Sequence, residues 1–175
     1  VKVTIERGGE SMDFDVTRQE IVEESVRSEM LDGNIGYIRI SGFNASTEGS
    51  SESTYTEFVE QTESLKTSGM QKLVIDLRDN PGGVLDVACD IADYILPEGI
   101  ITYTETRSGE REEYRSDASE LDIPIAVLIN GNSASASEVL VGALKDYGKA
   151  VVVGEKSYGK GIVQAVYPFY DGSGM

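Results

Sequence analysis

Two separate segments of the sequence carry side chains that could perform nucleophilic chemistry. A serine-rich run, 133–138, follows an apolar segment and opens a predicted helix, and Lys160 lies between two glycines near the end of the chain. A serine at a helix N-terminus is placed like a nucleophile, because the next main-chain N–H can stabilise an oxyanion. A lysine amine acts as a base only when a desolvated site keeps it neutral. The pattern therefore suggests a serine hydroxyl activated by a lysine.

The composition excludes most other ways of activating a nucleophile. The 175 residues include no histidine, which rules out Ser/His/Asp catalysis, Cys/His catalysis and the HExxH zinc site. The single cysteine, Cys89, can form neither an intrachain disulfide nor a thiolate metal cluster. We therefore expect no metal and no cofactor.

Charge and hydropathy restrict the partners of the protein. The chain has 15 Lys+Arg and 31 Asp+Glu, which gives a formal net charge of −16. Such acidity argues against binding to nucleic acid or to an anionic membrane. No apolar run reaches the roughly 18 residues that a membrane-spanning helix needs, and the first residues lack the pattern of a signal peptide.

The serine run and a glycine-containing turn at 79–83 each have a structural alternative. Ser135 and Glu138 have the spacing of a helix capping box, in which the serine hydroxyl is poorly aimed at a substrate. Gly82 and Gly83 leave main-chain N–H groups unshielded at a helix start, as an oxyanion or a phosphate requires. The same glycines are typical of a tight turn between a strand and a helix.

The lysine-bearing segment also has an alternative interpretation. Residues 154–160 match the GxxxxGK pattern of nucleotide-binding loops. However, Gly161 occupies the position of the Ser or Thr that binds Mg²⁺, and 162–167 is strand-like where a helix must begin. Nucleotide binding is therefore disfavoured. Lys156 is the competing lysine, but it lies in the more polar half of the segment.

An α/β core is expected to position these segments. Nearly continuous apolar runs predict buried strands at 73–77 and 124–129. The spacing of apolar residues predicts helices at 55–69, 84–95 and 136–147. Shorter patterns predict further strands at 37–40, 100–107, 112–115, 150–153 and 162–167. Strands that alternate with helices indicate a layered α/β fold.

Three parts are predicted along the chain. Residues 1–17 have the alternation and the Gly-Gly turn of a β-hairpin, which is marginal alone and is expected to belong to a small β domain. Residues 18–34 are interpreted as a linker, ambiguous between helix and extended chain. Residues 35–175 form the core, which we expect to be truncated at its C-terminal end because the chain stops directly after a turn.

Four ordered segments resemble one protein family. Residues 36–40, 76–83, 133–138 and 159–164 strongly resemble the motifs of the carboxyl-terminal processing proteases, the tail-specific Ser/Lys peptidases. The resemblance extends over roughly residues 35–167. It implies a ClpP/crotonase-like layered core of mixed sheet and helices, preceded by the last hairpin of a PDZ domain.

The resemblance also implies the site residues and the reaction. It makes Ser135 the nucleophile, Lys160 the base and Gln164 the side chain that orients the lysine. The oxyanion hole would combine the main-chain N–H of Ala136 with one from Gly82 or Gly83. The implied function is that of a serine endopeptidase that cleaves proteins near their C-terminal tails through an acyl-enzyme.

The implied partners are proteins or peptides with apolar C-terminal tails, and the implied location is extracytoplasmic. No membrane contact is expected from this part of the protein, and the resemblance is compatible with a homo-oligomer. The alternative function is a non-catalytic peptide- or ligand-binding module, because the retinoid-binding proteins of the eye resemble these proteases in fold. The presence of both Ser135 and Lys160 favours the enzyme.

Overall fold

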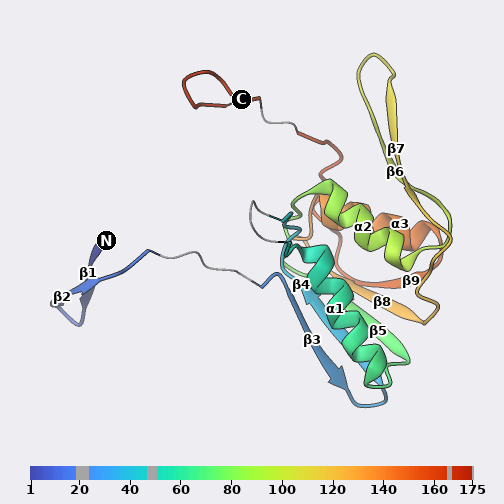
Figure 1. Ribbon diagram of the computed structural model, residues 1–175, viewed down its shortest axis with the longest axis horizontal. Coiled ribbons are helices and arrows are strands. Elements are labelled where there is room, and N and C mark those ends of the chain that lie inside the picture. Colours follow the sequence, from blue (N-terminus) through green and yellow to red (C-terminus); the bar gives the residue numbers. More distant parts are fainter. Residues whose placement is uncertain (19–23, 47–50, 165–166, 175) are drawn as a thin grey trace.

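A mixed five-stranded sheet forms the centre of the molecule. The computed structural model describes residues 1–18, 24–46, 51–164 and 167–174. The sheet has the spatial order β3 (Val26–Leu31), β4 (Ile35–Ile40), β5 (Lys72–Asp76), β8 (Ile125–Ile129) and β9 (Ala150–Gly154). β3 is antiparallel to β4, whereas β4, β5, β8 and β9 are parallel. The carboxyl ends of the parallel strands therefore meet at one edge, where α/β proteins commonly place their sites (Figure 1).

Three helices pack on one face of this sheet. α1 (Thr54–Thr67) contacts β3 and β4, α3 (Ala136–Asp146) contacts β9, and α2 (Leu85–Ile95) lies between the two helices (Figure 1). The predicted layered α/β core with a mixed sheet is therefore confirmed. No helix among the described residues is long and apolar enough to cross a membrane.

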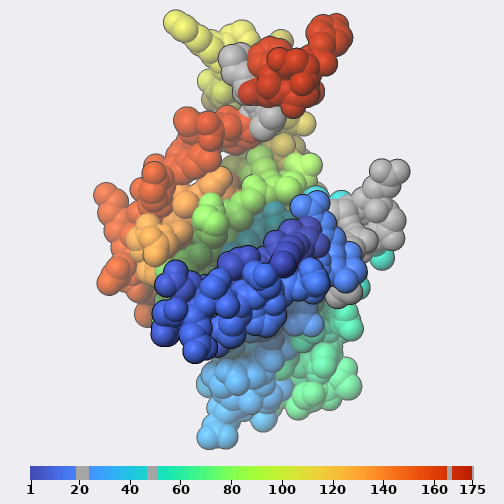
Figure 2. All heavy atoms as spheres, turned by 90° about the vertical axis from the view of Figure 1, so that its left-hand side faces the viewer, coloured from blue at the N-terminus to red at the C-terminus, as the bar shows by residue number. Residues whose placement is uncertain are grey.

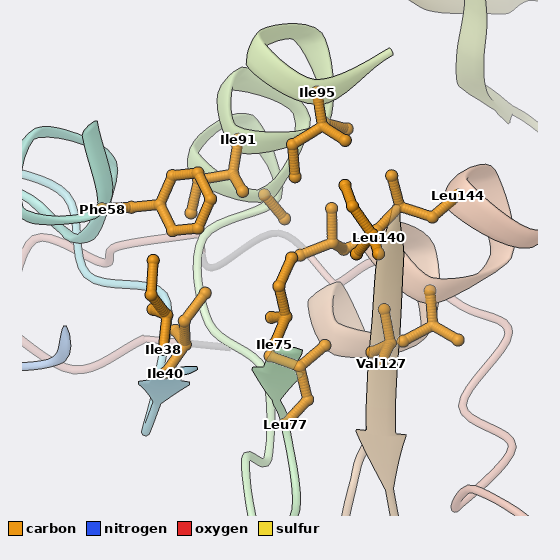
Figure 3. Close-up of a cluster of buried hydrophobic side chains, with 14 of the residues drawn as sticks. Ile38, Ile40, Phe58, Ile75, Leu77, Ile91, Ile95, Val127, Leu140 and Leu144 are labelled. Carbon is orange, nitrogen blue, oxygen red and sulfur yellow. The ribbon is translucent and has the colours of Figure 1, made fainter. Parts of the chain in front are cut away.

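The hydrophobic core lies between the helices and the sheet. The strand register pairs Ile38 with Ile75 and Ile75 with Val127, so that these side chains share one face of the sheet. All three are fully buried, and they lie beneath Ile91 of α2 and Leu140 of α3 (Figure 3). Each such side chain contributes about 1.5–3 kcal/mol through burial. This layer fixes α3, and with it the serine run at the N-terminus of that helix.

Two hairpins extend from the core. β6 (Gly99–Glu105) and β7 (Arg111–Ser116) follow α2 and project beyond the helical layer (Figure 1). β1 (Lys2–Arg7) and β2 (Glu10–Asp15) form the predicted N-terminal hairpin, and every residue in them is exposed or half-buried. Figure 2 shows this hairpin, in dark blue, in front of the core. Its origin in a PDZ domain stays a prediction.

Two expectations from the sequence are wrong. The predicted linker 18–34 contains β3, which pairs with β4 over its whole length, so the sheet begins before residue 35. The inward face of this edge strand carries Ser28 between Val26 and Met30, so its apolar alternation is weak. The strand predicted at 162–167 is absent from the described residues, since 162–164 and Tyr167 have no strand partner, and 165–166 lie outside the described residues. An apolar run forms a strand only where a partner satisfies its backbone hydrogen bonds.

Candidate active site

The three serines of the run 133–138 have different surroundings. Ser133 is buried, and its hydroxyl donates to the carbonyl oxygen of Leu77 at 2.7 Å. Ser137 is also buried, and its hydroxyl donates to the carbonyl oxygen of Asn80 at 3.0 Å. Ser135 is half-buried and lines a groove. Two of the serines therefore hold the loop together, and Ser135 alone of the three is presented to a ligand.

Ser135 is the N-cap of α3 and has an unusual backbone conformation. Its φ and ψ are 56° and −118°, so the chain turns sharply between β8 and the helix. The glutamate half of the predicted capping box is present, since the Glu138 carboxylate accepts the N–H of Ser135 at 2.9 Å, whereas the Ser135 side chain makes no capping hydrogen bond. The N–H of Glu138 donates to the carbonyl oxygen of Ser135 at 2.8 Å. Because the main chain already satisfies this N–H, capping of the helix does not depend on the serine hydroxyl.

Glu138 also holds the segment that carries the lysine. Its carboxylate accepts the N–H of Gly159 at 2.6 Å and the N–H of Lys160 at 2.8 Å, in addition to that of Ser135. Burial raises the pKa of Glu138, but the hydrogen bonds from the Ser157 side chain and from these three main-chain groups outweigh it and lower the pKa. An ionised carboxylate therefore connects the serine and lysine segments.

Most of the predicted site residues come together in one groove of about 550 Å³. The groove is lined by Ser135 and Ala136 at the start of α3, by Gly83 before α2, and by Lys160 and Gln164. No hydrogen bond joins Gln164 to Lys160 in the described part of the chain, so its orienting role stays a prediction. The other residues that line the groove are mainly apolar and include Val84, Leu85, Val139, Ile162, Val163 and part of β6.

Gly82, the remaining predicted residue, does not line the groove but packs directly behind the serine. A Cβ atom on Gly82 would lie 2.9 Å from the Ser135 Cβ and 2.7 Å from the carbonyl oxygen of Ala134. Its φ of 102° is also a conformation that favours glycine. This position therefore has no room for any side chain, which explains why the turn and the serine run can approach so closely.

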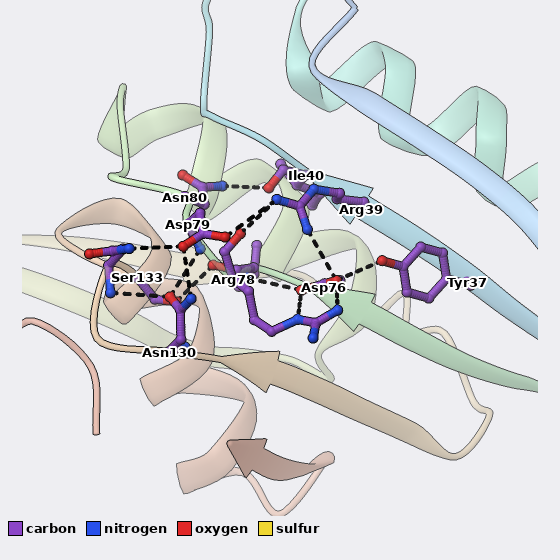
Figure 4. Close-up of polar contacts among 11 residues, drawn as sticks. Tyr37, Arg39, Ile40, Asp76, Arg78, Asp79, Asn80, Asn130 and Ser133 are labelled. Atoms are coloured by element: carbon purple, nitrogen blue, oxygen red, sulfur yellow. Dashed lines mark hydrogen bonds and ion pairs between the residues drawn. The ribbon is translucent and has the colours of Figure 1, made fainter. Parts of the chain in front are cut away.

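Asn80 links the turn to its neighbours (Figure 4). Its side chain is completely buried; Nδ2 donates to the carbonyl oxygen of Ile40 at 3.0 Å, and Oδ1 accepts the N–H of Gly82 at 2.8 Å. Its carbonyl oxygen accepts the N–H of Ala134 at 3.1 Å and the hydroxyl of Ser137. The turn, the end of β4 and the serine run are thus joined through a single residue.

A buried carboxylate supports the strand ends below the turn. Asp76 accepts hydrogen bonds from the hydroxyl of Tyr37 at 2.6 Å and from Nε and Nη2 of Arg78 at 2.9 and 2.7 Å (Figure 4). Arg39 Nη1 approaches the same carboxylate at 3.3 Å. Burial raises the pKa of Asp76, but the hydrogen bonds from Arg78 and Tyr37 outweigh it and hold the pKa at about 2. The carboxylate is therefore ionised at neutral pH.

Two other candidate groups do not form a site. No helix follows Lys160 in the described residues 161–164, so the helix N-terminus that a P-loop needs is missing there. Cys89 is buried within α2, and burial together with Asp86 and Asp90 raises the pKa of its thiol to about 12. A thiol in this state is a poor nucleophile.

Sequence reasoning missed Asn80 and Asp76 and saw Glu138 only as part of a cap. A local signal existed for two of them. Asparagine two residues before a glycine in a tight turn commonly accepts that N–H, and Ser-x-x-Glu marks a carboxylate at a helix start. No local pattern indicates that the carboxylate also reaches the lysine segment.

Comparisons with known proteins agree with this geometry. The sequence profile of peptidase family S41 matches residues 34–175. A carboxyl-terminal-processing protease from Synechocystis sp. is 39% identical over 168 residues, and one from Picosynechococcus sp. is 40% identical over 164 residues. The alignments cover 93% and 91% of this chain, and the chain spans about 38% of the length of each relative.

A solved structure has the same fold. The photosystem II D1 C-terminal processing protease superposes with a TM-score of 0.73 at 30% sequence identity. The match covers 94% of this chain and 45% of that protein. The family profile extends over most of the chain and includes all the segments that line the groove. The chain therefore belongs to peptidase family S41.

Proposed function

We propose that this chain carries the catalytic centre of a serine endopeptidase in which Ser135 is the nucleophile and Lys160 is the base. One observation supports this assignment above all others. Of the three serines in the run, Ser135 alone faces the groove that Lys160 also lines, while Ser133 and Ser137 are buried in structural hydrogen bonds. With no histidine in the chain, lysine is the base that remains within reach of this groove.

The proposed reaction is acyl transfer. Neutral Lys160 Nζ takes the proton of Ser135 Oγ, and the oxygen attacks the carbonyl carbon of the scissile peptide bond. The tetrahedral oxyanion collapses, the C–N bond breaks, and the ammonium of Lys160 returns the proton to the leaving amine. Water then attacks the ester carbonyl and gives its proton to Lys160; the second tetrahedral intermediate collapses, the bond from the carbonyl carbon to Oγ breaks, and Lys160 returns the proton to Ser135 Oγ, which releases the acid product and restores the free serine and the neutral lysine.

The oxyanion hole is proposed to combine the N–H groups of Ala136 and Gly83. Two observations favour Gly83 over Gly82. The N–H of Gly82 already donates to Asn80 Oδ1, and Gly83 lines the groove whereas Gly82 does not. Among the described residues, the N–H groups of Gly83 and Ala136 have no protein acceptor, so both remain available to a developing negative charge.

The proposed substrates are proteins with apolar C-terminal tails, and the proposed location is extracytoplasmic. The lining of the groove supports the first part, because Val84, Leu85 and Val139 adjoin Ser135 and no acidic residue lines it. An apolar side chain would gain burial there, whereas a basic side chain would find no carboxylate. The location rests on the family resemblance.

Replacement of Ser135 tests the proposal. In the full-length protein, Ser135→Ala should abolish cleavage of an apolar-tailed peptide and should also abolish labelling by a small fluorophosphonate. Mass spectrometry of the labelled wild-type protein should place the adduct on Ser135. Ser133→Ala and Ser137→Ala are the matched controls, and they should lower the melting temperature but retain turnover, because they lose structural hydrogen bonds.

Two results would contradict the proposal. Cleavage that survives Ser135→Ala but is lost in Ser133→Ala would place the nucleophile elsewhere in the run. A wild-type protein that binds apolar peptides but neither cleaves them nor reacts with the fluorophosphonate would instead be the binding module.

A further inference from the structure

The turn 79–83 offers two adjacent glycine N–H groups, but only one of them can serve the groove. The Gly82 N–H donates to Asn80 Oδ1 at 2.8 Å. The asparagine side chain thus closes a turn by accepting the main-chain N–H of the second residue after it. Gly83 follows with a φ of 147°, and a Cβ atom there would lie 2.2 Å from the carbonyl oxygen of Phe43. The chain around the second glycine is therefore tightly determined.

Asn80 is unusual because every polar group it carries is buried and used. Its side chain spans from Ile40, at the end of β4, to Gly82, and its own N–H donates to the carbonyl oxygen of Leu77 at 3.2 Å. Its carbonyl oxygen accepts hydrogen bonds from the N–H of Ala134 and from the hydroxyl of Ser137. These two residues flank Ser135 and Ala136. The side chain therefore acts directly on the glycine turn, while the main chain of the same residue holds the serine run.

We propose that Asn80 is a positioning residue which selects Gly83 as the oxyanion donor, by holding the N–H of Gly82 away from the groove. This inference rests on the proposed peptidase function. Asn80 touches neither the substrate nor the reacting atoms; it acts through the direction of the next two peptide groups. Its effect should therefore appear in the transition state, where the negative charge develops, and not in the binding of the substrate.

The test compares Asn80→Ala with Asn80→Ser in the full-length enzyme. Both variants lose the hydrogen bond to Ile40. Serine can still accept the N–H two residues ahead, whereas alanine cannot. Asn80→Ala should lower kcat about 100-fold with KM unchanged within about threefold, and Asn80→Ser should retain roughly tenfold more of the kcat. The affinity for a peptide aldehyde should fall in parallel with kcat/KM, while the affinity for the product peptide should not change.

A stability control separates positioning from general loss of structure. Ile95→Val removes a methyl group from the far end of α2 and should lower the melting temperature while kcat stays within about twofold. If Asn80→Ala does not fold, Asn80→Ser alone tests the proposal. In that variant kcat and the affinity for the peptide aldehyde should fall, while KM should not change. Equal losses of kcat in the two variants, or a loss confined to KM, would overturn the proposal. A wild-type protein that does not cleave the peptide at all would instead refute the peptidase function itself.

Discussion

The two walls of the groove beside Ser135 are built in different ways. The first wall, the turn 79–83 with the run 133–138, is held by three buried polar residues, Asn80, Ser133 and Ser137, whose side chains bond to the main chain of Ile40, Leu77 and the turn itself. The second wall, 154–164, consists largely of exposed side chains; Tyr158, Ile162 and Val163 are 70%, 65% and 66% exposed. Lys160 belongs to this second wall.

The second wall is attached at a few points. The N–H of Tyr158 donates to the carbonyl oxygen of Ser133 at 3.0 Å, and Glu138 accepts the N–H groups of Gly159 and Lys160. The proposed nucleophile and oxyanion donors are thus fixed by the fold, whereas the proposed base depends mainly on one carboxylate. Regions with few buried contacts open at low free energy, so the lysine wall is the part whose position most easily changes.

The largest effect is expected at the base. Lys160→Arg places a permanently charged guanidinium where the proposed mechanism needs a neutral amine, so kcat should fall by at least about 10³-fold. Lys156→Arg, on the same wall but outside the groove, is the matched control and should keep full activity. Steady-state cleavage of the same peptide measures both. Appreciable turnover in Lys160→Arg would rule out the dyad.

A glycine in each wall compares their rigidity. Gly82 and Gly159 both have positive φ, but a Cβ atom on Gly82 would collide with Ser135, whereas one on Gly159 would meet nothing within 4 Å. Gly82→Ala should therefore lower kcat about 10²–10³-fold and also destabilise the protein. Gly159→Ala should cost only the backbone strain of about 1–2 kcal/mol, with less than about tenfold loss of kcat. Similar losses in the two variants would show that the walls do not differ.

Replacement of Glu138, whose carboxylate connects the two walls, should have an intermediate effect on kcat. Glu138→Gln replaces one acceptor oxygen by an amide that faces N–H donors, which leaves either Gly159 or Ser135 and Lys160 without a partner. We expect a loss of about 30–100-fold in kcat and a comparable slowing of the fluorophosphonate labelling of Ser135, because both reactions need the lysine to deprotonate the serine. Glu155→Gln is an exposed control and should behave as the wild type. A kcat within about twofold of the wild type would show that the position of Lys160 does not depend on Glu138.

Asp76→Asn, below the first wall, should have the smallest effect on activity but a clear effect on the free energy of unfolding. Because the folded-state pKa of Asp76 is about 2 and its ordinary value is 3.8, the carboxylate stabilises the fold above about pH 4. This contribution, about 2 kcal/mol, is lost as the pH falls from 4 to 2. Urea unfolding of the wild type and Asp76→Asn should therefore differ most at pH 5 and converge near pH 2. Asp122→Asn, at an exposed position, should show no such convergence.

The sequence predicted most elements because their apolar residues have strong local patterns. The strand at 73–77 and the helix at 136–147 match β5 and α3 to within about a residue. The sequence does not reveal β3, because on its inward face a serine separates two apolar residues, which leaves too short an alternation to recognise. The apolar segment after Lys160 was taken for a strand, although secondary structure in such a segment depends on a partner far away in the sequence.

The site divides along the same line. Ser135, Lys160 and the glycines belong to short motifs, and the resemblance of these motifs to the protease family predicts their roles. Asn80 contacts Ile40 from 40 residues away, and Glu138 contacts Gly159 from 21 residues away. Hydrogen bonds of this range depend on the assembled sheet, and no local pattern specifies them.

The backbone at Ser135 has a thermodynamic consequence. At φ 56° and ψ −118°, a residue with a Cβ atom is held in a sparsely populated conformation at a cost of about 1–3 kcal/mol, which glycine largely avoids. Ser135→Gly should therefore melt above Ser135→Ala, although both lack the hydroxyl. At this position glycine would give the more stable fold but has no hydroxyl for the proposed reaction, so serine is present at a cost in thermal stability.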